Sequence, residues 1–248
     1  MTDPLLEGFW LLGLVAVVTA MAATVASASG FGFNLLACPL LILVHGNAKI
    51  VVPAMHLAWL PLGVVLCWQL RKLPDVRRVA LLLAGALPGA LIGVWLLNLV
   101  EVSVMRPVIG TATIVLALAM TTRFHRPLIR EHRWVAATGV ISGALGGSTA
   151  ISGPPVVLLG LNQGWDPSRF RAELIFYFTL LGAGSVAMFA SRRMLGAECF
   201  SIAAAGVPGL VVGYFAGTWL GRYLDGPRFR VACVVLLCLA GILLWIGR

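Results

Sequence analysis

Long uncharged stretches alternate with short charged ones along the whole chain. Eight blocks contain no Asp, Glu, Lys or Arg, at residues 8–48, 50–70, 79–100, 107–122, 134–165, 174–191, 199–221 and 231–247. About 20 apolar residues in a helix cross the roughly 30 Å hydrocarbon layer of a membrane. Six blocks match one such helix in length, whereas 8–48 and 134–165 are too long for one. The pattern predicts an all-α polytopic membrane protein with an unusual segment in each long block.

Each long block contains a polar stretch rich in glycine. The first runs from Ser27 to Pro39 (SASGFGFNLLACP), and the second begins 115 residues later, from Ser142 to Pro155 (SGALGGSTAISGPP). Serine and glycine favour an opened backbone, and proline lacks the N–H that a helix interior needs. Unwound backbone at membrane depth persists only where protein buries it or where it lines a wet cavity. The stretches predict two broken or re-entrant segments, and such a matched pair is typical of a transporter's binding site.

The two halves of the chain resemble each other. ALPGALIG at 86–93 matches GVPGLVVG at 206–213 with an offset of 120, and Pro39 matches Pro154 with an offset of 115. We assign the difference to a longer loop around 164–167. The sequence therefore predicts a first transmembrane repeat at 1–122, a basic cytoplasmic linker at 123–133 and a second repeat at 134–248. Each half would contain four long helices and one broken segment.

Charge favours an inverted arrangement of the two halves. If each broken segment crosses, there are ten crossings, and 13 of the 18 Lys and Arg residues face the cytoplasm. If each segment dips in and returns, there are eight crossings, and the split is 11 to 7. Because Lys and Arg accumulate on the cytoplasmic side, the inverted version is preferred. The number of crossings, between 8 and 10, stays open.

Composition excludes several classes of protein. At 60% hydrophobic and 11% charged residues, the chain leaves no room for an aqueous domain. The net charge of +9 is distributed over loop flanks, so it predicts no nucleic-acid partner. Five cysteines without a CxxC motif indicate neither a metal site nor a disulfide framework, and no cofactor is expected. Without paired carboxylates or a Ser/His arrangement in the apolar segments, the protein is predicted not to be an enzyme.

The polar stretches suit the binding of a small oxyanion. Glycines allow backbone N–H groups to approach a ligand, and small side chains add donors beside the positive end of a half-helix. The predicted substrate-binding residues are Ser29, Gly30, Gly32, Asn34, Gly146, Gly147, Ser148, Thr149, Ser152 and Gly153. With the offset of 115, Asn34 pairs with Thr149. The alternative is that these small polar residues pack helices and bond back to helix carbonyls.

Three further residues are candidates for gating or coupling. Lys49 and Arg169 precede the helix that follows each broken segment, where a cation can attract an anion. The alternative is that both are loop cations at the membrane interface. His56 lies within an apolar helix, where an ionisable group is a functional candidate and a possible proton acceptor. A neutral histidine bonded between helices is the alternative, since its repeat partner is Phe176.

These features resemble the TauE/SafE family of sulfite exporters. The resemblance rests on Ser29-Gly-Phe-Gly32 with Pro39, on Gly146-Gly147 with Pro154, and on the Pro-Gly-x-x-x-Gly helix in each half. It implies a multi-pass permease of the bacterial inner (plasma) membrane that moves sulfite, thiosulfate-like or organosulfonate anions. The family's first turn is typically a glycine run, whereas here it continues with Phe33-Asn34.

The resemblance leaves alternatives open. The alternatives to a secondary transporter are a passive anion channel, a permease for a non-sulfur organic anion and a membrane scaffold. The particular anion, the direction of transport, the coupling ion and a homodimeric assembly also stay open. The expected partners are the small oxyanion and the lipid bilayer.

Overall fold

The computed structural model describes residues 4–71, 74–119, 131–221, 238, 241–242 and 244–246. These residues form the helices α1 (Pro4–Ser29), α2 (Phe33–His45), α3 (Ala48–Leu70), α4 (Val76–Leu99), α5 (Val102–Ala119), α6 (Glu131–Thr149), α7 (Gly153–Gln163), α8 (Pro167–Ser191) and α9 (Ala197–Leu220). Most of the predicted linker 123–133 and most of the last uncharged block, 231–247, lie outside the described residues.

Within the described residues, five helices are long and apolar enough to cross a membrane: α1 from Trp10 onward, α3, α4, α8 and α9. They coincide with uncharged blocks of the sequence, so the prediction of a helical, multi-pass membrane protein is confirmed. Helix α2 and the stretch 102–115 of α5 are shorter apolar helices. Polar residues at the starts of α3, α4 and α8 accept hydrogen bonds from first-turn N–H groups, through Asn47, Asp75 and Asp166.

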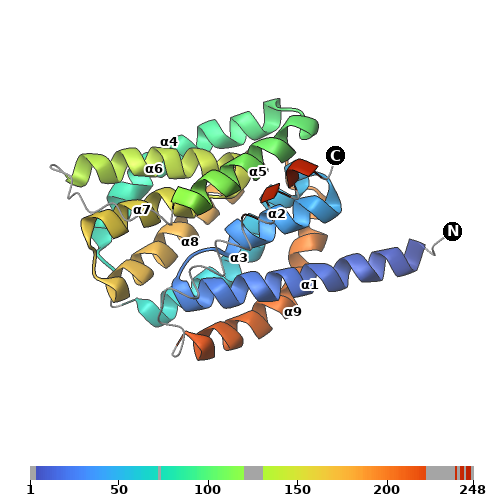
Figure 1. The fold of residues 1–248 in the computed structure, drawn as a ribbon, viewed down its shortest axis with the longest axis horizontal. Helices are drawn as coiled ribbons and strands as arrows, with labels where there is room; N and C mark the ends of the chain where they lie inside the picture. Colours follow the sequence, from blue (N-terminus) through green and yellow to red (C-terminus); the bar gives the residue numbers. More distant parts are fainter. Residues whose placement is uncertain are drawn as a thin grey trace.

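Two closely packed helix pairs flank a central group of helices (Figure 1). Helix α1 lies along α9 on one side, α4 lies along α6 on the other, and α2, α3, α7 and α8 lie between them. Glycines permit both close pairs: a Cβ on Gly89 would lie 2.2 Å from the carbonyl oxygen of Val140, and one on Gly213 would lie 2.4 Å from that of Ala20. Glycines spaced by four residues on α4 and α9 therefore lie in the contact surfaces of these pairs.

Contacts recur along the chain at a spacing of 120 residues. The pair α1–α9 has its counterpart in α6–α4, and α3–α9 has its counterpart in α8–α4. The ion pair between His45 and Glu198, with Nε2 and Oε1 2.8 Å apart, has its counterpart in Trp165 and Arg78, whose guanidinium lies 4.1 Å from the indole centroid. His45 corresponds to Trp165, 120 residues later, and Glu198 corresponds to Arg78, 120 residues earlier. The offset of 115 used to compare the polar stretches is therefore wrong.

The breaks are much shorter than the polar stretches predicted. Backbone leaves the helical path only at 30–32, between α1 and α2, and at 150–152, between α6 and α7. Gly30, Gly32 and Ala150 have positive φ angles of 86°, 97° and 62°. Ser142, Gly146 and Gly147 lie inside the regular helix α6, and α2 continues through Pro39. Figure 1 shows α2 turning back from the end of α1 rather than continuing in its direction.

Candidate functional site

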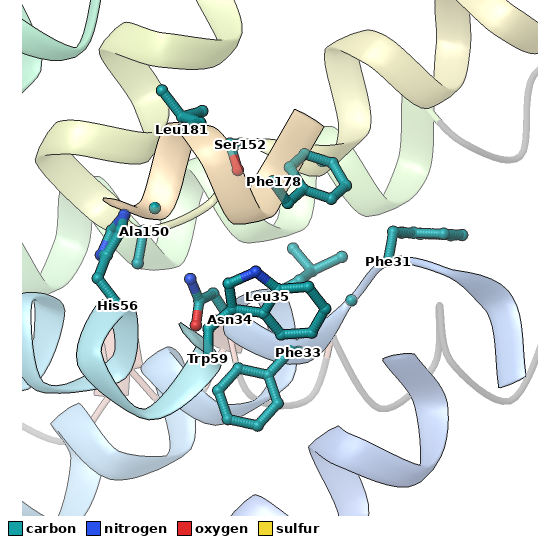
Figure 2. Close-up of a pocket in the computed structure, with 13 residues that line it drawn as sticks. Phe31, Phe33, Asn34, Leu35, His56, Trp59, Ala150, Ser152, Phe178 and Leu181 are labelled. Carbon is teal, nitrogen blue, oxygen red and sulfur yellow. The ribbon is translucent and has the colours of Figure 1, made fainter. Parts of the chain in front are cut away.

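A cavity lies where the two bends meet α3 and α8 (Figure 2). Its enclosed interior is about 30 Å³, and the empty space together with the open mouth is about 470 Å³. Its lining consists of Phe31, Gly32, Phe33, Asn34 and Leu35 from the first bend and α2, His56 and Trp59 from α3, Ala150, Ser152 and Gly153 from the second bend, and Phe178, Leu181 and Gly182 from α8. Segments more than 100 residues apart in the sequence thus share one small space.

Two buried polar atoms of the lining have no hydrogen-bond partner among the described residues. They are Oδ1 of Asn34 and Nε1 of Trp59. Figure 2 shows the amide nitrogen of Asn34 directed toward the second bend and the hydroxyl of Ser152 directed into the cavity. Leaving a buried polar group unpaired costs about 1–3 kcal/mol. This cost is removed if a polar ligand or water occupies the cavity.

The cavity brings together Gly32, Asn34, Ser152 and Gly153 of the predicted substrate-binding residues. Trp59 was missed by the sequence prediction. It lies three residues after His56, on the same face of α3, since residues at this spacing are neighbours on a helix. The spacing of three residues from His56 is therefore the sequence signal that would have pointed to Trp59.

His56 forms part of the cavity wall and is almost fully buried. Its Nδ1 lies 2.9 Å from the carbonyl oxygen of Val52, one helical turn earlier, and must donate because a carbonyl only accepts. In the neutral ring, Nε2 then carries the lone pair. The ring packs edge-on against Phe189, with centroids 5.4 Å apart. The imidazole is therefore fixed in orientation, with its second nitrogen available for other contacts.

Three of the predicted hydroxyl donors bond back to their own helices instead of lining the cavity. The hydroxyl of Ser29 donates to the carbonyl of Val25 at 2.8 Å, and that of Thr149 donates to Leu145 at 2.8 Å. Ser148 donates to Ala144 at 2.7 Å. This is the packing alternative raised by the sequence. Ser29 and Thr149 end α1 and α6 and also accept from the N–H two residues later, so both hold the bends in place.

Three of the predicted glycines serve packing rather than the cavity. A Cβ on Gly147 would lie 2.6 Å from the carbonyl oxygen of Ala90 in α4, and one on Gly30 would lie 2.7 Å from Cγ of Arg171. A Cβ on Gly146 would lie 3.0 Å from Cβ of Ser152. The predicted pairing of Asn34 with Thr149 is also wrong, because the spacing of 120 relates Asn34 to Pro154 and Thr149 to Ser29.

The predicted steering cations lie away from the cavity. Nζ of Lys49 donates to the carbonyl of Asn98 at 2.9 Å, near the end of α4, and Arg169 is exposed beside the start of α8. Arg171 and Glu173, two residues apart on α8, contact different partners. Arg171 Nη2 donates to the Ser27 carbonyl near the end of α1, a favourable place for a cation.

Helix α8 also holds the second bend. The hydroxyl of Tyr177 donates to Ser142 Oγ at 2.8 Å, and Ser142 donates to the carbonyl of Ser152. Tyr177 and Ser142 are both fully buried. Through Arg171 and Tyr177, α8 thus contacts both bends that form the cavity. No cluster of three His, Cys, Asp or Glu residues suited to a metal ion occurs in the described part of the chain.

Comparison with known proteins identifies the family. The family model described as sulfite exporter TauE/SafE matches residues 15–244. The chain belongs to this family. Membership confirms the resemblance read from the sequence, and together with the five apolar helices it supports a multi-pass membrane protein.

One relative is a probable sulfite/organosulfonate exporter TauE from Cupriavidus necator. It is 28% identical to this TauE/SafE chain over 158 residues, which cover 62% of the chain and 60% of the relative. The similarity thus spans about three fifths of the relative's length. No solved structure matches the chain.

Proposed function

We propose that this protein is a secondary transporter that exports a small sulfur oxyanion, such as sulfite, thiosulfate or an organosulfonate, across the bacterial inner membrane. The observation that carries the proposal is the small cavity between the two bends, where the buried indole N–H of Trp59 is a donor without a partner among the described residues, in a chain of the TauE/SafE family. The name of the Cupriavidus relative supports the choice of sulfur oxyanions over other anions.

The donors available to the anion are distributed unequally between the bends. Helix α2 begins at Phe33 without a side-chain cap, so its first-turn N–H groups have no partner within the helix. Helix α7 carries Pro154 and Pro155 in its first turn, and proline has no N–H. The oxyanion therefore lies closer to α2, where the side chains of Asn34 and Trp59 add donors to the helix terminus.

The export experiment tests the cavity directly. A Cβ on Gly153 would meet only Phe31 and Phe178, at 3.6 and 3.7 Å, so Gly153→Val keeps the backbone but fills the cavity. We expect at least a tenfold loss of sulfite efflux from loaded proteoliposomes. Trp59→Phe removes the indole N–H and should weaken anion binding roughly 10- to 100-fold, as for a lost hydrogen bond to a charged group.

Gly196→Val is the matched control, because a Cβ at Gly196 meets nothing within 4 Å. Normal efflux in both monodisperse Gly153→Val and Trp59→Phe proteins would show that the cavity is not the anion site. Counterflow in the wild-type protein separates a carrier from a passive channel, since a channel shows no exchange acceleration.

The two halves are further proposed to be duplicated and inverted in the membrane. If α1 crosses and the first bend with α2 returns, α3, α4 and α5 complete five crossings, and the second half begins on the opposite side. This arrangement keeps 13 of the 18 Lys and Arg residues in the cytoplasm. The recurrence of helix contacts at a spacing of 120 supports it.

Labelling at both ends of α8 tests this topology. In a protein whose five cysteines are replaced, Ser168→Cys is expected to react only from the cytoplasm and Ser191→Cys only from the periplasm. Both positions are exposed in the structure. The opposite pattern, or reaction of both from one side, would rule out the inverted arrangement.

A further inference from the structure

Among the described residues, His56 is the one ionisable side chain that lines the cavity. Helix α3 packs against α2, α5, α6, α8 and α9. The other charged or titratable groups on these helices are Cys38 and His45 on α2, Lys49 and Cys67 on α3, Arg106 on α5, Glu131, His132 and Arg133 on α6, Arg169, Arg171, Glu173 and Tyr177 on α8, and Glu198, Cys199 and Tyr214 on α9. None of them belongs to the lining.

The nearby charges lie outside the cavity lining. Arg171 donates from Nη2 to the Ser27 carbonyl, and its buried Nε has no partner among the described residues. Glu173 accepts two hydrogen bonds from Arg78, and His45 pairs with Glu198. Lys49 donates to the Asn98 carbonyl. The lining thus supplies dipoles and N–H donors but no fixed positive charge.

An anion in such a space lacks a counter-charge. Transferring an unpaired ion from water into a low-dielectric interior is costly, and dipoles offset only part of that cost. Neutral His56 makes the cost higher, because its Nδ1–H is used by Val52 and its Nε2 lone pair would face the oxyanion. Protonated His56 instead donates a charge-assisted hydrogen bond from Nε2.

We propose that the cavity binds the anion together with one proton, which is held on Nε2 of His56. The inference rests on the proposed function, since it concerns the same site. The proton comes from the solution to which the cavity is open and leaves with the anion on the other side. A monovalent anion then crosses as a neutral pair with its proton. Binding of the anion and of the proton strengthen each other by the same factor, because linkage is reciprocal.

Proton uptake on binding is the decisive measurement. Methanesulfonate is a suitable probe because it is the anion of a strong acid and carries no proton of its own. Titration calorimetry in buffers of different ionisation enthalpy, between about pH 5.5 and 8.5, covers the range in which an imidazole titrates. We expect uptake that approaches one proton per anion at the alkaline end, with affinity falling about tenfold per pH unit there.

The variants assign the proton to its residue. His56→Gln should bind without proton uptake and with an affinity that no longer depends on pH, whereas His45→Gln, outside the cavity, should behave like the wild type. In proteoliposomes, an imposed membrane potential should leave methanesulfonate transport by the wild type unchanged. It should alter transport by His56→Gln, because that variant carries the anion alone.

A failure of the proton inference can be distinguished from a failure of the proposed anion site. Binding of methanesulfonate without proton uptake by the wild type, or unchanged uptake by His56→Gln, would overturn the inference and leave the proposed function standing. If neither methanesulfonate nor sulfite binds, with sulfite corrected for its own protonation, the proposed site itself is wrong. If His56→Gln does not fold, proton uptake by the wild type and the response of its methanesulfonate transport to membrane potential still test whether the anion binds with a proton.

Discussion

Gly143→Ala is expected to lower the stability of the protein strongly. A Cβ at Gly143 would lie 2.0 Å from the carbonyl oxygen and 2.8 Å from Cα of Ala86 in α4. These are backbone atoms, so no side chain can rotate away, and α4 and α6 must separate along their contact. Close packing is what holds helices together in lipid, where the hydrophobic effect contributes little. The cost should reach the upper end of the roughly 1–3 kcal/mol typical of overpacking.

Size-exclusion profiles and thermal unfolding in detergent measure this effect. Gly13→Ala is the control, because it makes the same change in a membrane helix where nothing lies within 4 Å of the new Cβ. If Gly143→Ala melts at the same temperature as Gly13→Ala, the close contact of α4 and α6 is not as described. Gly147→Val would test this same contact and not the anion site, since its Cβ meets Ala90.

Arg78→Ala is expected to destabilise the protein by about 3–5 kcal/mol, the usual cost of removing one partner of a buried ion pair. Arg78 Nη1 donates to both carboxylate oxygens of Glu173, at 2.8 and 2.9 Å, and the Glu173 side chain is only 1% exposed. Without the guanidinium, this carboxylate is left buried between α4 and α8. The stacking of Arg78 on Trp165 is lost as well.

The change in unfolding temperature relative to Arg77→Ala measures the effect of the charge pair, because Arg77 is an exposed neighbour on the same turn. The double variant Arg78→Met with Glu173→Leu should recover much of the loss, since it removes both charges and keeps apolar volume. Equal stability of Arg78→Ala and Arg77→Ala would contradict the pairing. No recovery in the double variant would mean that most of the stability lost in Arg78→Ala comes from the contact of Arg78 with Trp165.

The sequence predicted the helices well because lipid leaves few alternatives. A bilayer requires backbone hydrogen bonds to be satisfied within each segment, so an uncharged block of about 20 residues is a helix wherever it crosses. The glycines at spacing four on α4 and α9 lie at close helix contacts for a related reason, since little besides close packing draws helices together in lipid. The positions of both bends followed approximately from the local chemistry of Gly, Ser and Pro.

The lengths of the breaks did not follow from the same residues. Ser142, Gly146 and Gly147 have low helix propensity, yet they lie in a regular helix because neighbouring segments pack against it. Gly147 faces α4, Gly146 faces Ser152, and Ser142 bonds to Tyr177 of α8. Propensity alone cannot distinguish a glycine that opens a helix from one that admits a neighbouring helix. This ambiguity also contributed to the wrong offset of 115, since that offset aligned Gly147, a packing glycine of α6, with the bend glycine Gly32.

By itself, the sequence determined the class of the protein, the position of most helices, its family and the importance of the stretches around Asn34 and Ser152. Only the tertiary structure decided which polar atoms reach the cavity. Hydroxyls such as those of Ser29 and Thr149 turn back to their own helix carbonyls, whereas Trp59, which no motif marks, faces the bends because α3 packs between them. The orientation of a side chain depends on contacts with residues distant in the sequence, and a local sequence pattern does not specify those contacts.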